Sequence, residues 1–156
     1  MKYVVTIEHE NGRFLAVHAF EGRPDEMAEM QGQAFGTVAE HLAAIGVPIE
    51  GAAVSCYEMS DDTFHVSSGF VVGGPIASGD GVESLQLPDV DVASTTHIGP
   101  YNQLGMAYEA LKEGAEAKER HVDASAIMWE EYLTGPDSPP DEITTLVHWP
   151  LEPAGA

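Results

Sequence analysis

One five-residue stretch near the C-terminus combines the side chains best suited to chemistry. It runs Met128-Trp129-Glu130-Glu131-Tyr132, and its aromatic content favours a β-strand. Because side chains alternate across a strand, Met128, Glu130 and Tyr132 would share one face. A carboxylate beside a phenol and a thioether suits a cationic aromatic ligand, which would pair with the charge and stack on the ring. In a core, Glu130 would instead be a buried charge that needs a partner, and an ordinary strand glutamate is simply solvated.

Other residue types used in catalysis form no recognisable motif. His97 stands before Gly99-Pro100, where we interpret it as a residue that fixes a strand-to-helix turn by hydrogen bonding. The histidines show no metal-ligand spacing, and the sequence has neither a GxSxG motif nor a phosphate-binding glycine loop. Cys56 is the only cysteine, which excludes an internal disulfide and a Cys-based zinc site; we expect it to be a small buried hydrophobe. We therefore expect no metal and no cofactor.

Length and composition indicate one soluble domain. A chain of 156 residues with 44% hydrophobic residues can bury a sizeable core without a metal or disulfides. Its apolar runs are too short to span a membrane. The first residues alternate between apolar and polar side chains and include charged ones, where a signal peptide would be apolar throughout. We expect a single domain over residues 1–156, located in the cytoplasm and without a membrane partner.

The net charge of −20 constrains the partners. Direct binding to nucleic acid requires basic side chains that release counterions, so we do not expect it. An acidic surface attracts cationic ligands over a distance, in a salt-dependent way. The simplest explanation is a solvated acidic surface, as in organisms from high-salt habitats or with GC-rich genomes. The alternative is a surface that mimics DNA towards a DNA-binding protein.

The apolar periodicity predicts eight strands and two helices. In the first half, a hairpin turns at Asn11-Gly12, and a helix begins at Pro24 and ends before Gly46. In the second half, a helix carries the stripe Tyr101, Leu104, Tyr108, Leu111 and Ala115. The expected strands are Tyr3–His9, Arg13–Phe20, Ala52–Met59, Thr63–Val72, Val82–Leu87, Asp91–Ile98, Ser125–Leu133 and Ile143–Trp149.

The order strand–strand–helix–strand–strand occurs twice, over residues of about 1–76 and of about 80–151. A glycine-rich linker from Gly73 to Gly81 separates the two copies. Antiparallel strands with one amphipathic helix per copy predict an α+β fold with helices on one side of the sheets. Two such pseudo-symmetric halves would leave a ligand cleft between them.

The repeat also predicts which residues correspond. Tyr57 takes the place of Tyr132, and Ser55 takes the place of Glu130, so we expect paired tyrosines but one central carboxylate. On the helices, Tyr108 corresponds roughly to Phe35. These two rings would line the cleft, or would belong to an ordinary core stripe.

Three segments together resemble a known family. HIGPYNQLGMAYEAL, WEEYL and, after a proline-containing loop, ITTLVHWPL are similar to the GyrI-like small-molecule-binding domain. This domain is also the effector-binding half of multidrug-responsive bacterial transcription regulators of the BmrR and Rob kind. The resemblance covers essentially the whole chain. It implies two halves packed about a pseudo-twofold axis, with a cleft that takes hydrophobic, often cationic, compounds.

The resemblance also implies site residues. The family's central carboxylate matches Glu130, with Tyr132 beside it. The tyrosine of the Gly-Pro-Tyr turn matches Tyr101, and the helix aromatic matches Tyr108, while Trp129 adjoins the motif. The sequence shows no DNA-binding helix-turn-helix segment, so we do not expect this polypeptide alone to control transcription.

Three functions agree with these observations. The first is a stand-alone protein that senses or sequesters a hydrophobic or cationic small molecule, with Glu130 neutralising charge and Tyr57, Tyr108 and Tyr132 stacking. The second is hydrolysis of reactive cyclopropane-bearing natural products, as in some stand-alone relatives, with Glu130 as general base if desolvation raises its pKa. The third is an acidic modulator of a DNA-binding enzyme such as gyrase. We expect binding rather than catalysis, and leave open a protein partner or a homodimer.

Overall fold

The computed structural model describes residues 3–23, 26–60, 63–100, 103–134 and 138–153. The chain folds into two compact units: unit 1 contains residues 1–11 and 89–156, and unit 2 contains residues 12–88. Each unit holds four antiparallel strands and one long helix. The predicted α+β class with antiparallel sheets is therefore confirmed, as is the element order strand–strand–helix–strand–strand in both halves of the chain.

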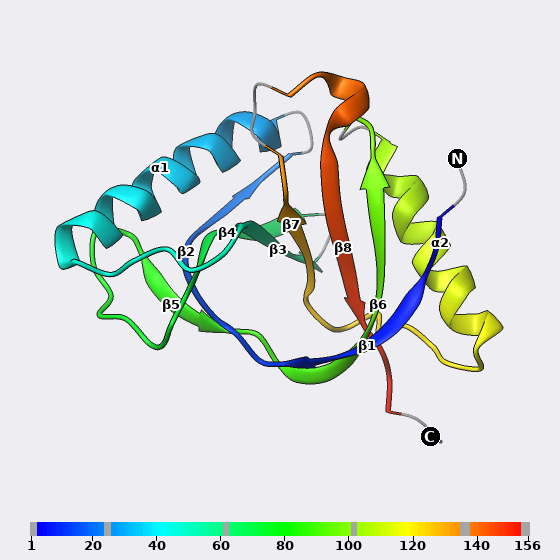
Figure 1. Cartoon of the computed structure of the whole chain (residues 1–156). Coiled ribbons are helices and arrows are strands. Elements are labelled where there is room, and N and C mark those ends of the chain that lie inside the picture. Colours follow the sequence, from blue (N-terminus) through cyan, green and yellow to red (C-terminus); the bar gives the residue numbers. More distant parts are fainter. Residues whose placement is uncertain (1–2, 24–25, 61–62, 101–102, 135–137, 154–156) are drawn as a thin grey trace. The chain divides into compact units, whose positions relative to one another are not determined.

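Unit 1 is a four-stranded sheet with one helix against it (Figure 1). Its strand order is β1 (Thr6–Asn11), β6 (Asp89–Ile98), β8 (Thr144–Pro150) and β7 (Met128–Tyr132), and its helix is α2 (Leu104–Ala117). The helix buries Ala107, Leu111 and Ala115 in one cluster with Ala93 of β6 and Val147 of β8. We call the sheet surface that carries Ala93 and Val147 the α2 face. A 3₁₀ turn, Pro140–Glu142, precedes β8.

Unit 2 repeats this arrangement with different residues. Its strand order is β3 (Ala53–Ser60), β4 (Thr63–Val72), β2 (Phe14–Gly22) and β5 (Glu83–Gln86), and its helix is α1 (Met27–Ile45). Val38 and Leu42 of α1 are buried against Ala16 and Val72. The helix ends at Gly46, whose φ of 72° is the left-handed conformation that glycine adopts without strain.

The predicted hairpin across Asn11-Gly12 is wrong. β1 pairs antiparallel with β6, and β2 pairs with β4 and β5. The first strand of each repeat therefore completes the sheet built on the second strand of the other repeat. Alternation predicts that a strand forms but not which strand it pairs with. The partner of β1 is set by packing, because Val5 and Ile7 pack against the core cluster under α2.

Among the described residues, neither helix combines the length and apolar character that crossing a membrane requires.

Candidate ligand-binding site

Glu130 is the centre of a buried polar cluster on the α2 face of unit 1. Its carboxylate accepts a hydrogen bond from the Tyr108 hydroxyl at 2.5 Å and another from the Tyr132 hydroxyl at 2.8 Å. The two phenols contact different carboxylate oxygens, Oε2 and Oε1 respectively. Glu130 is only 4% exposed, whereas both tyrosines are half-buried.

Strand register and helix packing bring these side chains together. Glu130 lies opposite Val147 and Tyr132 opposite Thr145 in the β7–β8 ladder, so both point to the α2 face. Tyr108 reaches the same carboxylate from α2. The Trp149 ring of β8 meets the Tyr108 ring edge-on, with centroids 6.1 Å apart. As alternation predicts, Glu130 and Tyr132 share one face of the strand.

This geometry suits an ionised carboxylate. An ionised carboxylate only accepts hydrogen bonds, and here each oxygen receives one from a phenol O–H. Phenols stabilise the anion without contributing positive charge of their own. An ionised Glu130 would be a buried negative centre flanked by aromatic rings, a combination that suits an aromatic or lipophilic cation.

The equivalent place in unit 2 has a serine hydroxyl in place of the carboxylate. The side-chain amide of Gln31, from α1, donates to the Tyr57 hydroxyl at 2.5 Å and to the Ser55 hydroxyl at 3.4 Å. Ser55 is fully buried and lies 2.7 Å from the Ser68 hydroxyl. Ser55 with Tyr57 and Glu130 with Tyr132 thus occupy similar networks, one built around a serine hydroxyl and the other around a carboxyl group.

The helix residue in the unit 2 network is Gln31. The sequence does not single it out, because a glutamine in an amphipathic helix usually lies on the solvent-exposed face.

Phe35, the predicted counterpart of Tyr108, is half-buried and meets Phe70 with ring centroids 5.6 Å apart. Trp129 is completely buried. It stacks on His148 with centroids 5.4 Å apart and lies on the sheet face opposite Glu130. Tyr101 lies outside the described residues.

His97 has the structural role expected of it. Its Nε2 lies 3.1 Å from the Pro100 carbonyl oxygen, and its Nδ1 lies 2.8 Å from the Tyr3 hydroxyl. Since a carbonyl only accepts, Nε2 carries the proton and Nδ1 accepts from Tyr3. Within the described ranges, His, Cys, Asp and Glu side chains form no group of three able to hold a metal ion.

A family model matches nearly the whole chain. Residues 4–152 fit the model described as the GyrI-like small molecule binding domain. A comparison with curated protein sequences found no match.

Several solved structures share the fold. The EcmrR C-terminal domain is 18% identical with a TM-score of 0.79, over 97% of this chain and 99% of that domain. A hydrolase from Listeria innocua is 12% identical with a TM-score of 0.70, over 95% and 91% of the two chains. SAV2435, solved bound to tetraphenylphosphonium, is 13% identical with a TM-score of 0.65, over 97% and 94%. At these identities the likeness establishes the fold alone.

Proposed function

We propose that this chain, which belongs to the GyrI-like small molecule binding domain family, binds a hydrophobic cation at the buried carboxylate of Glu130. The observation that carries the proposal is the pair of hydrogen bonds from Tyr108 and Tyr132 to the two oxygens of Glu130. They fix an anionic centre between two aromatic rings. A lipophilic cation would gain both charge pairing and cation–π contact there.

Three further features support the proposal. The rim of the cluster is aromatic, since Trp149 packs edge-on against Tyr108. The net charge of −20 raises the local concentration of cations by long-range attraction. A structural neighbour, SAV2435, was solved with tetraphenylphosphonium, which is a lipophilic cation. In this role the protein would sense or sequester its ligand, and Tyr57, Phe35 and Tyr101 remain predicted contacts.

Hydrolysis is a second candidate function, favoured by the neighbour described as a hydrolase. Glu130 would act as general base on a water molecule, and the hydroxyls of Tyr108 and Tyr132 would orient its carboxylate. Turnover of an electrophilic cyclopropane-bearing substrate that is lost in Glu130→Ala would establish this activity. Absence of turnover over a broad substrate panel would remove it.

The binding proposal is tested with a matched cation and neutral compound. Tetraphenylphosphonium and triphenylphosphine oxide are titrated against the protein by calorimetry. We expect the cation to bind at least about tenfold more tightly, because only the cation pairs with a carboxylate in a low-dielectric site. Equal affinity for the two compounds, or no binding of the cation, would contradict the proposal.

A further inference from the structure

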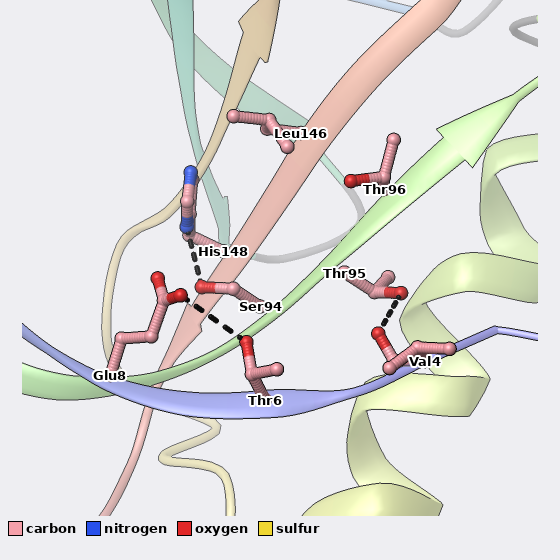
Figure 2. A pocket seen from close by; sticks show the side chains of 8 residues that line it. All are labelled: Val4, Thr6, Glu8, Ser94, Thr95, Thr96, Leu146 and His148. Carbon is pink, nitrogen blue, oxygen red and sulfur yellow. Dashed lines mark hydrogen bonds between the residues drawn. The ribbon is translucent and has the colours of Figure 1, made fainter.

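A pocket lies on the face of the unit 1 sheet opposite Glu130. It has a volume of about 310 Å³ and is lined by side chains from the segment leading into β1, from β1 itself, and from β6 and β8. The lining residues are Val4, Thr6, Glu8, Ser94, Thr95, Thr96, Leu146 and His148 (Figure 2). Register explains their meeting, because Ser94 lies opposite both Thr6 and His148, and Thr96 lies opposite Leu146.

Two of the lining residues, Ser94 and His148, belong to a buried polar chain. The Ser94 hydroxyl lies 2.7 Å from His148 Nδ1, and His148 Nε2 lies 3.2 Å from Glu131 Oε1. Ser94, His148 and Glu131 are 6%, 3% and 7% exposed. The proposed ligand site at Glu130 uses none of these three side chains.

The direction of these interactions decides what the pocket can recognise. Nε2 of His148 and Oε1 of Glu131 are within ion-pair distance but lack hydrogen-bond geometry. The negative carboxylate favours the neutral tautomer with the proton on Nε2, and Nδ1 then accepts from the Ser94 hydroxyl. The Thr6 hydroxyl donates to Glu8 at 3.4 Å, and the Thr95 hydroxyl donates to the Val4 carbonyl at 2.8 Å. The hydroxyl protons of Thr6, Ser94 and Thr95 are thus already used within the protein.

What remains available in the pocket is mainly acceptor capacity. The hydroxyl oxygens of Ser94 and Thr6 and the carboxylate of Glu8 lie close together (Figure 2). The apolar side chain of Leu146 also lines the pocket, further along β8 than His148. A ligand that satisfies acceptors must bring donors, and a carboxylate favours donors that carry positive charge. The volume is at the low end for small-molecule sites, which favours a small ligand.

We propose that this pocket is a second binding site, for a small aliphatic compound that carries a primary ammonium or guanidinium group. The charged head contacts Glu8, Thr6 and Ser94, and the alkyl part lies along Leu146. The site is independent of the proposed function at Glu130, because it lies on the other face of the sheet and uses other side chains. It also differs in ligand chemistry, since none of the described residues that line it is a phenylalanine, tyrosine or tryptophan.

Trp129 provides an internal reporter for this pocket. Its ring stacks on His148, with centroids 5.4 Å apart, and the chain has two tryptophans. The Trp149→Phe variant therefore leaves Trp129 as the single tryptophan. In this background, 1,4-diaminobutane is titrated and Trp129 emission is followed, with 1,4-butanediol as the neutral compound of the same length.

We expect a saturable change in Trp129 emission with 1,4-diaminobutane. 1,4-Butanediol should bind at least about tenfold more weakly. Glu8→Gln and Ser94→Ala should each weaken diamine binding by about three- to tenfold, as for the loss of one hydrogen bond or ion pair. Glu116→Gln, which removes one exposed charge from α2, should leave the affinity unchanged.

Equal binding of diol and diamine would overturn the proposal, as would unchanged affinity in both Glu8→Gln and Ser94→Ala. Circular dichroism and urea unfolding establish whether Ser94→Ala is folded. If it is not, Glu8→Gln decides the outcome, because Glu8 lies exposed on β1 and its substitution leaves the buried chain intact.

Discussion

Glu130 and Glu131 are neighbours in β7, yet their carboxylates lie on opposite faces of the unit 1 sheet. Glu130 accepts hydrogen bonds from Tyr108 and Tyr132 on the α2 face. Glu131 lies 3.2 Å from His148 on the other face. Both are nearly buried, at 4% and 7% exposure. Strand alternation thus places two carboxylates, one residue apart, in two different chemical environments.

The phenol hydroxyls should stabilise the fold through Glu130. Tyr108→Phe and Tyr132→Phe should each lower the free energy of unfolding by about 1.5–3 kcal/mol, the usual range for a hydrogen bond to a charged group. Urea unfolding measures both effects. In a Glu130→Gln background each substitution should have a smaller effect, because the partner is then neutral. Equal effects in the two backgrounds would show that the hydroxyls act elsewhere.

A helix glycine should be indispensable for the packing of α2. A Cβ atom on Gly114 would lie 2.6 Å from Val5 Cβ, so Gly114→Ala should destabilise unit 1 by about 1–3 kcal/mol. Gly36→Ala is the matched control, because no atom of the described residues outside its own helix turn lies within 4 Å of its added Cβ in α1. It should stabilise the protein by about 0.5–1 kcal/mol through helix propensity. If Gly114→Ala stabilised the protein as much as Gly36→Ala does, the close approach of Val5 to Gly114 would be contradicted. Adding Val5→Ala should partly restore Gly114→Ala.

The single thiol should be unreactive in the folded protein. Burial raises the pKa of Cys56 to about 12, so almost no thiolate is present at neutral pH, and the thiolate is the reacting species. A disulfide reagent at pH 8 should modify no thiol in the native state and all of it in guanidinium chloride. Fast modification of the native protein would contradict the burial of Cys56.

The contact between His9 and Asp91 should make stability depend on pH. Hydrogen bonds to Asp91 and Asp89 raise the pKa of His9 above its ordinary 6.5, and hydrogen bonds to His9 and Arg120 lower the pKa of Asp91 below its ordinary 3.8. The stabilisation by His9 is fully present below pH 6.5 and is lost as the pH rises through the raised value. The stabilisation by Asp91 is present above pH 3.8 and is lost as the pH falls through the lowered pKa of Asp91.

The His9→Gln variant should therefore unfold at lower urea concentration than the wild type near pH 5, and at the same concentration near pH 9. The effect should be small and should diminish in 1 M salt, because these side chains are exposed. A difference that is independent of pH would show that the charged His9 is not responsible.

The sequence predicts which side chains share a surface where the reason is local. Alternation in β7 and helical spacing at Tyr108 depend on neighbours in the chain; Glu130 and Tyr132 do share one face, and Tyr108 does pack with the helix stripe. The opposite face depends on which strands pair. Ser94, His148 and Glu131 come from three strands, and they meet only through the registers of β6–β8 and β7–β8. Nothing in the spacing of these residues predicts that meeting.

Strand partners are also where the sequence misleads. An Asn-Gly pair between two alternating segments is a strong hairpin signal, yet Gly12 passes the chain from β1 in unit 1 to β2 in unit 2. Local turn chemistry is outweighed there by the burial of Val5 and Ile7 against the α2 cluster. Tertiary packing, rather than propensity, selects the partner of each first strand.

The most direct measurement is the affinity of Glu130→Gln for tetraphenylphosphonium. Glutamine keeps the size of the side chain and can still accept a hydrogen bond, but it removes the charge. We predict that Kd rises by about tenfold or more, about 1.4 kcal/mol, while Glu116→Gln binds like the wild type. An unchanged Kd in a folded Glu130→Gln protein would contradict the role assigned to the carboxylate.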